Sequence, residues 1–440
     1  MAQFFKPQPK PKSLPTVELV IDSLDLHGVG VARSQGKTVF VEGGMPGEKV
    51  RARLVEEKKQ HAFAQLLQVL EPSAQRVEPV CPNYAQCGGC STQHLPSELQ
   101  LSVKVEGVKQ IFRRLAGHEL AEPEFVWQSA TEHYRRTCRL SIKYDKKART
   151  SRLGFRRRHS QELVEVEACP VLEPALSALI APLRLLCNQL KSFRDLGHIE
   201  LCASDSGVVL LVRHNGSLPE QDLQLLQAFA TEHALACFIQ TKDEPQHLSG
   251  EPNPFYVVSG ISVGFVPGDF LQVNRVVNEQ MVAQALAWLA PTKADKVLDL
   301  FCGLGNFTLP LANMAEEVVG IEGVITMVQR ARENALRNRL ENVRFFQCDL
   351  AASFEDMPWA KERFDLVILD PARPGAAETI RHLLKLNPRR LVYVSCNPVT
   401  AARDSQPLLK AGYRLSRWGL FDMFPHTGHV ETILLFEKLE

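Results

Sequence analysis

The sequence has no apolar run long enough to cross a lipid bilayer, which excludes a membrane-spanning helix from the expected architecture. It also lacks an apolar segment followed by small residues near its start, so we expect no signal peptide. Residues 1–15 are instead rich in proline and lysine, and we expect them to form a disordered lead-in. No internal repeat is present. We therefore expect a cytoplasmic protein.

The sequence also has no large excess of positive or negative charge. The formal net charge of +1 says nothing about a polyanionic partner. A chain of 440 residues with 45% apolar and 23% charged residues is typical of a globular protein with about two or three domains. Its 11 cysteines are an odd number for a cytosolic chain, so clustered cysteines indicate metal ligands or catalytic groups rather than disulfides.

Three structural regions follow the lead-in. Residues 16–74 alternate apolar and polar positions between glycine-rich turns, which predicts a small closed β-barrel. Residues 75–270 mix strands and helices in a central α+β domain, and a helix predicted over 98–115 can pack on the domain that follows. Residues 271–440 alternate strands and helices, which predicts a doubly wound, mainly parallel α/β sheet.

The start of the C-terminal region has the features of a nucleoside-cofactor site. A strand over Lys296–Leu300 leads into Asp299-Leu-Phe-Cys-Gly-Leu-Gly-Asn306, where glycines allow close backbone approach. Asn306-Phe307 fills the space that a pyrophosphate would need, so S-adenosylmethionine, which has no phosphate, suits the loop better than a dinucleotide. Glu322 ends the next strand, where it can bind ribose hydroxyls, and Asp349 follows the third, near the adenine.

The last strands predict the reaction. Asp370 follows the strand FDLVILD, Cys396 follows RRLVYVS, and Glu431 lies on the final strand of an antiparallel pair typical of class I methyltransferases. C5 of uracil is a poor nucleophile until a thiolate adds to C6. A reaction at C5 therefore needs one thiol and one base, and Cys396 and Glu431 are the candidates.

Other interpretations of these residues remain open. Cys302 and Cys348 also lie at strand ends and are rival nucleophiles, although their position inside the cofactor-binding segments favours packing roles. Asp370 can bind the uracil N3–H or hold a turn with Pro371. The DPARP segment lacks the aromatic typical of amino-group methyltransferases and the second cysteine typical of cytosine-C5 RNA enzymes.

Five segments together resemble the bacterial uracil-5 RNA methyltransferase family, and GVGVAR and GMPGEKV resemble the TRAM domain of its members that act on 23S rRNA. The resemblance implies an OB-like TRAM barrel, a Rossmann-like catalytic domain, Cys396 as nucleophile and Glu431 as proton acceptor. It further implies a cofactor and base pocket of Gln272, Phe301, Asn306, Glu322, Asp349 and Asp370. The five segments are FLQVN (270–274), DLFCGLGNFTLPLA (299–312), LDPARPG (369–375), VSCNP (394–398) and FPHTGHVE (424–431).

A cysteine cluster suggests a metal centre. Cys81, Cys87 and Cys90 form C-x5-C-x2-C, and Cys169-Pro170 lies far downstream. Four thiolates suit either zinc or an iron–sulfur cluster, and the three-plus-one spacing favours iron–sulfur while leaving zinc open. The family resemblance implies a 4Fe–4S cluster, for which we expect a structural role.

A basic stretch between Arg135 and Arg158 contains a single acid, Asp145, and three interleaved aromatic residues, Tyr134, Tyr144 and Phe155. Beside a barrel, this composition suits phosphate neutralisation and stacking on unpaired bases, and the target uridine must leave its stack to reach Cys396. The basic residues are Arg135, Arg136, Arg139, Lys143, Lys146, Lys147, Arg149, Arg152, Arg156, Arg157 and Arg158.

The resemblance thus implies a 23S rRNA substrate, and we expect a monomer with no membrane association and no obligate protein partner. Three alternatives remain. The chain could act on tRNA, although the barrel and cysteine cluster argue against the smaller tRNA enzyme. It could be an RNA-binding protein with a degenerate domain, but nucleophile and base are both present. A small-molecule methyltransferase would leave about 270 residues without a purpose.

Overall fold

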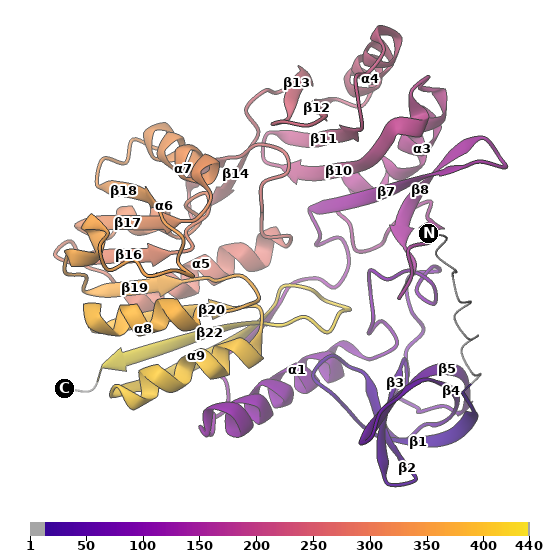
Figure 1. The fold of residues 1–440 in the computed structure, drawn as a ribbon, viewed down its shortest axis with the longest axis horizontal. Coiled ribbons are helices and arrows are strands. Elements are labelled where there is room, and N and C mark those ends of the chain that lie inside the picture. Colours follow the sequence, from indigo (N-terminus) through magenta and orange to yellow (C-terminus); the bar gives the residue numbers. More distant parts are fainter. Residues whose placement is uncertain (1–13, 439–440) are drawn as a thin grey trace, which may run out of the picture. The chain divides into compact units, whose positions relative to one another are not determined.

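The computed structural model describes residues 14–438, so all but the last two residues of the predicted lead-in lie outside the described part (Figure 1). The chain forms two compact units, one of Met1–Pro79 with Ser91–Gly107 and one of Val80–Cys90 with Val108–Glu440. None of the helices within 14–438 is long and apolar enough to cross a membrane. The domain limits expected at 74/75 and 270/271 stay a prediction.

The first unit contains a closed five-stranded barrel, as the alternating pattern predicts. Leu19 and Ile21 point inward while Glu18 and Val20 face out, and the other strands alternate likewise around an aliphatic core. The strands follow the order β1-β2-β3-β5-β4 and comprise β1 (Thr16–Leu24), β2 (Gly30–Ser34), β3 (Lys37–Glu42), β4 (Lys49–Glu57) and β5 (His61–Glu71).

The helix predicted over 98–115 is observed as α1 (Ser97–Ile111) followed by a π-helical turn, η1 (Phe112–Ala116), which ends at Gly117 with φ +63°. The turn belongs to the second unit, where it packs on α9 (Pro398–Lys410). There the Gln406 amide donates a hydrogen bond to the carbonyl of Leu115. The end of this helix therefore packs on α9.

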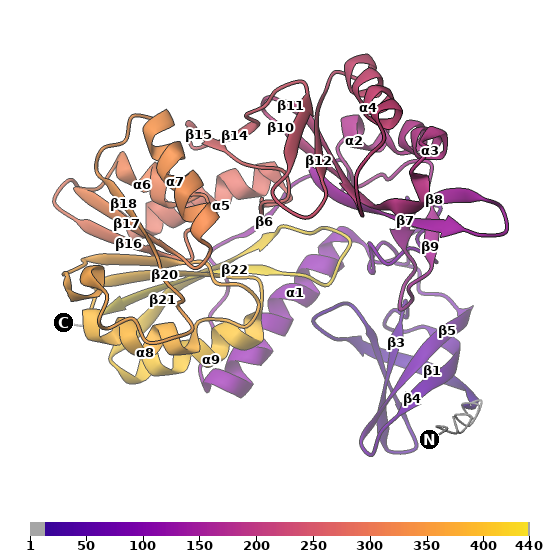
Figure 2. The ribbon, with the colours of Figure 1, turned by 45° about the horizontal axis from the view of Figure 1, so that its top comes forward.

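The second unit begins with a seven-stranded, mostly antiparallel sheet in the order β13-β12-β11-β10-β7-β8-β9. Its core is formed by aliphatic residues of the strands and of the helices that cover them. Figure 2 shows the β7–β8 hairpin extending beyond the rest of this sheet. The elements are β7 (Thr137–Asp145), β8 (Thr150–Arg156), β9 (Leu163–Glu165), α2 (Pro174–Ser177), α3 (Ile180–Gln189), η2 (Phe193–Asp195), β10 (Leu196–Ser204), β11 (Gly207–His214), α4 (Glu220–Glu232), β12 (Leu235–Gln240) and β13 (Gln246–Ser249).

A hairpin of β14 (Phe255–Val258) and β15 (Ile261–Gly264) precedes an eight-stranded sheet in the order β18-β17-β16-β19-β20-β22-β21-β6. Its central strands are mostly apolar and buried, because helices cover both faces of a parallel sheet. Figures 1 and 2 show α5, α6 and α7 on one face and α8 and α9 on the other. These elements are β6 (Val126–Gln128), α5 (Arg275–Leu289), β16 (Lys296–Leu300), α6 (Thr308–Ala312), β17 (Glu317–Glu322), α7 (Ile325–Arg337), β18 (Val343–Gln347), η3 (Pro358–Lys361), β19 (Leu366–Leu369), α8 (Ala377–Leu386), β20 (Arg390–Ser395), β21 (Tyr413–Asp422) and β22 (Glu431–Lys438).

The end of the sheet has the predicted antiparallel pair. β22 runs antiparallel to both β20 and β21, whereas β16 to β20 are parallel. The upstream strand β6 adds to β21 at the edge of the sheet. The predicted α/β class and the OB-like barrel are therefore confirmed, and the carboxyl ends of the parallel strands meet at one edge, where ligands bind in such sheets.

Candidate active site

Strand register brings Cys396 and Glu431 together. Ser395, the last residue of β20, pairs with Thr432 of β22, and the Thr432 hydroxyl donates to the Ser395 carbonyl at 3.2 Å. Because the strands are antiparallel, the next residue of one chain, Cys396, comes opposite the preceding residue of the other, Glu431. A thiol and a carboxyl separated by 35 positions in sequence thus meet at the sheet edge.

The electrostatics of this pair are dominated by burial. The pKa of the half-buried Cys396 thiol is raised to about 11 by burial and by the nearby Glu431 and Asp370, against a lowering influence of Arg373. Glu431 is 3% exposed, and burial together with Asp370 raises the pKa of its carboxyl well above the ordinary value. Burial raises the pKa of Asp370 to about 7. These three groups therefore hold protons readily, and a carboxyl with a raised pKa is a stronger base.

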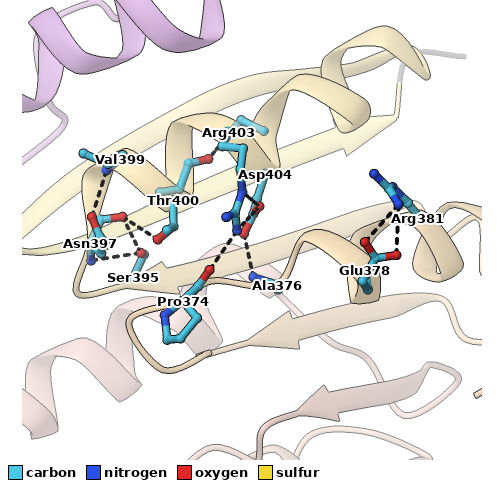
Figure 3. A network of polar contacts seen from close by, with 12 residues as sticks. Pro374, Ala376, Glu378, Arg381, Ser395, Asn397, Val399, Thr400, Arg403 and Asp404 are labelled. Carbon is cyan, nitrogen blue, oxygen red and sulfur yellow. Dashed lines mark hydrogen bonds and ion pairs between the residues drawn. The ribbon is translucent and has the colours of Figure 1, made fainter. Parts of the chain in front are cut away.

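The loop that carries Asp370 is tied to the start of α9 (Figure 3). The carbonyl of Arg373 accepts hydrogen bonds from the Asn397 amide at 3.0 Å and the Thr400 hydroxyl at 3.4 Å. The Asn397 side chain also accepts from the backbone N–H of Val399 at 3.1 Å and so caps α9. The cap of one helix thus fixes the distance between the Asp370 loop and Cys396.

Two residues that the sequence did not single out complete this attachment. Asp404 of α9 is buried and accepts hydrogen bonds from the Ala376 N–H at 2.6 Å and the Tyr393 hydroxyl at 2.8 Å. Arg403 donates to the Pro374 carbonyl at 2.8 Å and pairs with Asp404 at 2.7 Å (Figure 3). No sequence signal distinguishes a buried acid in an amphipathic helix from a solvated one.

The predicted cofactor loop makes a sharp turn after β16. Phe301 has φ +66°, in the left-handed region that few residues other than glycine adopt, and Gly303 and Gly305 follow with φ +55° and +96°. The Glu322 carboxylate, at the end of β17, accepts hydrogen bonds from the N–H groups of Gly303 at 3.1 Å and Val324 at 2.9 Å. Each carboxylate oxygen has a second lone pair, so Glu322 retains acceptor capacity for ribose hydroxyls.

Asp299 is a further site residue that the sequence did not assign. It is fully buried at the end of β16, and the Thr308 hydroxyl donates to its Oδ2 at 2.5 Å. Its Oδ1 has no hydrogen-bond partner among residues 14–438. Burial raises its pKa to about 7, with contributions from Asp370 and Glu322. A lone acid within an apolar strand was the available signal, since such a residue needs a reason to be buried.

Three other predicted pocket residues have different surroundings. The Asn306 side chain exchanges hydrogen bonds with Asn278 of α5 at 3.0 and 3.1 Å and accepts one from the Tyr256 hydroxyl at 3.2 Å. The backbone carbonyl of Gln272 accepts from Arg136 at 2.8 Å. Exposed Asp349 accepts from the N–H of Ala351 at 3.0 Å. Their binding roles stay predictions.

The rival cysteines are both buried. Cys302 is 3% exposed and Cys348 is 9% exposed. Burial is the main cause that raises the pKa of each thiol, well above the ordinary value for Cys302. Cys396 is the most solvent-exposed of the three thiols, which agrees with packing roles for Cys302 and Cys348.

Three of the four clustered cysteines, Cys81, Cys87 and Cys169, lie close enough to influence one another in the second unit. Burial raises the pKa values of Cys87 and Cys169, and the neighbouring Cys81 contributes to both shifts. The sulfur of Cys87 accepts a hydrogen bond from the N–H of Gly89 at 3.4 Å, a type of bond that tunes iron–sulfur ligands. The donor set therefore suits a cluster, but within residues 14–438 no three His, Cys, Asp or Glu side chains are arranged to hold a metal ion.

The residues of the basic stretch fall into two groups, those bonded within the protein and those exposed to solvent. Arg136 is 1% exposed and lies 4.7 Å from the Tyr256 ring, Arg139 and Arg152 pair with Glu200 and Glu165 across the sheet, and other arginines bind backbone or side-chain oxygens. The lysines and the arginine at the tip of the β7–β8 hairpin differ, because they are exposed and form no ion pair in the described part of the chain. These are Lys143, Lys146, Lys147 and Arg149.

The fold and the site define a class I S-adenosylmethionine-dependent methyltransferase. The chain belongs to the family described as tRNA (Uracil-5-)-methyltransferase, which matches residues 97–439, and a TRAM domain matches residues 15–67. Proteins named 23S rRNA (uracil(1939)-C(5))-methyltransferase RlmD are 54% identical over the full length of both chains in Aeromonas salmonicida and in Tolumonas auensis. The solved Pyrococcus abyssi tRNA (uracil-54, C5)-methyltransferase, in complex with S-adenosyl-L-homocysteine, is similar in fold, with a TM-score of 0.73 at 24% identity over 96% of this chain and 100% of that one.

Proposed function

We propose that this protein transfers a methyl group from S-adenosylmethionine to C5 of one uridine in 23S rRNA, the position numbered 1939 in the names of its relatives. The observation that carries the proposal is the register that opposes Cys396 and Glu431 beside Asp370. Full-length relatives favour 23S rRNA over tRNA. A substrate of this kind would place the protein in the cytoplasm, where we propose that it acts as a monomer.

Cys396 is the nucleophile in this proposal. Its sulfur bonds to C6 of the uracil, which makes C5 electron-rich, and it leaves again when the C5 proton has been removed. The bound S-adenosylmethionine supplies an electrophilic methyl group. Burial and two neighbouring acids keep the thiol protonated in the unliganded state. Its proton must therefore pass to solvent, which reaches the half-buried thiol, before the thiolate sulfur can add to C6.

Glu431 is the base. Its buried carboxyl has a raised pKa, so its carboxylate accepts the C5 proton more readily than an exposed glutamate would. Asp370 lies close enough to influence both groups, and its raised pKa makes both of its forms available near neutral pH. The protonated form can donate a hydrogen bond to a uracil carbonyl, and the ionised form can accept one from N3–H.

The cofactor site is formed at the ends of β16, β17 and β18. We propose that Glu322 accepts hydrogen bonds from the ribose hydroxyls, that Phe301 and Gln272 line the pocket, and that Asp349 binds the adenine amino group. Asn306 braces the loop against α5 through Asn278, in addition to lining the pocket.

We further propose that Cys81, Cys87, Cys90 and Cys169 hold a 4Fe–4S cluster that braces the central domain. The proximity of Cys81, Cys87 and Cys169 and the N–H bond to the Cys87 sulfur support this. Anaerobic purification followed by iron, sulfide and zinc analysis tests it. About four irons per chain would support the proposal, and stoichiometric zinc would replace it.

Trapping with 5-fluorouridine tests the reaction. Fluorine at C5 cannot leave as a proton does, so 23S rRNA carrying 5-fluorouridine should form a stable covalent complex in the presence of S-adenosylmethionine. Mass spectrometry should locate the bond on Cys396, and Cys396→Ala should form none, whereas Cys348→Ser serves as the matched control. Preferential trapping of 5-fluorouridine tRNA would support the alternative substrate, and an adduct on Cys302 or Cys348 would contradict the mechanism.

A further inference from the structure

Three aromatic rings form a cluster on the outer surface of the barrel. Phe40 of β3 and Phe63 of β5 are direct partners in the parallel ladder, and their rings are stacked with centroids 5.4 Å apart and an interplanar angle of 25°. The His61 ring lies edge-on to both, with centroids 5.4 Å from Phe63 and 6.2 Å from Phe40. These rings face out because the alternate residues Val39 and Ala62 face the core.

Stability of the barrel alone does not account for this cluster. The barrel core is complete without these rings, and Phe63 remains 37% exposed. A cross-strand pair on a solvated face contributes little to stability, and pairs of other residue types supply that contribution equally well. Outward-facing aromatic rings on a strand surface are instead a feature on which unpaired bases stack.

The charges around the cluster suit a nucleotide. Lys58 lies 5.8 Å from the Phe63 ring centroid and neutralises Glu56 at 3.2 Å, and Lys37 neutralises Glu57 at 2.6 Å. Arg33 of β2 pairs in register with Thr38 of β3, one position along the outer face from Phe40. In the described part of the chain, exposed Arg33 has no acidic partner, so it can bind a phosphate.

We propose that Phe40, His61 and Phe63 form a base-stacking platform that holds an unpaired nucleotide of the RNA substrate, with Arg33 binding its phosphate. The platform includes β3, which belongs to the face that barrels of the OB kind use for oligonucleotides. The inference rests on the proposed action on RNA but adds a binding site outside the methyl-transfer residues.

Single-stranded RNA with one 2-aminopurine, about ten nucleotides long, provides the probe. In the full chain, stacking on the platform should quench the probe's fluorescence. Phe63→Leu keeps an apolar side chain on the strand but removes the ring face, and should weaken binding about tenfold, while Phe63→Trp should retain it. Leu67→Ala is the matched control, because Leu67 is 47% exposed on the same strand, outside the cluster.

Two further measurements separate the platform from the barrel's stability and from the catalytic proposal. Phe63→Leu should keep the wild-type Tm, raise KM for rRNA and leave kcat unchanged. Wild-type affinity and KM in both Phe40→Leu and Phe63→Leu would overturn the platform even if the wild type forms its 5-fluorouridine adduct. Failure of the wild type to form that adduct would instead refute the proposed reaction, and the probe titration would still report on the platform.

Discussion

The backbone N–H of Ala376 donates a 2.6 Å hydrogen bond to the carboxylate of Asp404, a fully buried acid in the middle of α9 (Figure 3). The same carboxylate accepts from Tyr393 and pairs with Arg403, which in turn binds the Pro374 carbonyl. The Asp404 carboxylate thus anchors the loop that starts at Asp370. The position of Asp370 beside Cys396 depends on this anchor.

Asp404→Asn should therefore reduce both stability and activity. The amide lacks the charge that pairs with Arg403. Its NH2 group is a donor, so it cannot accept the hydrogen bonds that the carboxylate accepts from Ala376 and Tyr393. We expect a loss of about 1–3 kcal/mol in the free energy of unfolding, together with a lower kcat for RNA methylation. Urea unfolding and steady-state kinetics measure the two effects.

Glu378→Gln provides the control for this substitution. Its pair with Arg381 at 2.9 Å is exposed and joins residues within α8, so it should contribute less than about 1 kcal/mol. Equal losses in Asp404→Asn and Glu378→Gln would show that the buried anchor has no special role.

The thiol of Cys396 should react as a group with a raised pKa. Its alkylation by iodoacetamide in the unliganded protein should increase with pH toward a midpoint near 11, since only the thiolate reacts. Asp370→Asn removes one negative neighbour and should shift the midpoint to lower pH. Peptide mapping should find Cys302 and Cys348 protected in the folded protein. A wild-type midpoint below the ordinary thiol value would contradict the assigned electrostatics.

The sequence predicted the elements that depend on local patterns. Alternation in β1 and β5 predicted the barrel, and acids and glycines after buried strands predicted the edge where Cys396, Glu322 and Asp370 lie. Cys396 and Glu431 could be named individually, but their opposition depends on the pairing of β20 with β22, which no local pattern encodes.

Long-range polar contacts were beyond the sequence for a physical reason. Asp404 and Asn278 are buried because partners from distant segments satisfy them, and a sequence shows only their polarity. The basic stretch illustrates the same limit, because Arg139 and Arg152 form ion pairs with glutamates from other strands. The sequence shows their positive charges but not the glutamates that pair with them.

Glu431→Gln should separate the two halves of the reaction. The amide cannot accept the C5 proton, so the bond between Cys396 and C6 should form and persist on ordinary uridine. We expect turnover to fall by roughly 10²–10⁴-fold, with a covalent RNA complex visible by denaturing electrophoresis without fluorinated RNA. Cys396→Ala should lack this complex. Rapid turnover by Glu431→Gln would assign the base to another residue, with Asp370 the nearest candidate.

Acid should weaken the barrel through Glu48. This residue is fully buried, and Arg76 binds both its oxygens, at 2.6 and 2.7 Å. With the N–H groups of Met45 and Ser73, these contacts hold the pKa of Glu48 below its ordinary value of 4.5 despite burial. A depressed pKa means that the unfolded chain binds the proton first as pH falls. The stabilisation is therefore complete above about pH 4.5 and is lost as pH falls through the lower, folded value.

Glu48→Gln tests this link directly. At pH 7 the free energy of unfolding of the variant should be lower by about 3 kcal/mol, because removal of one partner breaks a buried pair. The variant should therefore unfold at a lower urea concentration than the wild type. The difference between wild type and variant should shrink as the pH falls below 4.5, since protonation removes the same charge from the wild type. Glu18→Gln, which removes an exposed partner of Arg51 on the same barrel, should leave the stability close to that of the wild type. A gap between Glu48→Gln and wild type that stays constant from pH 7 to pH 3 would mean that packing, rather than charge, makes Glu48 necessary.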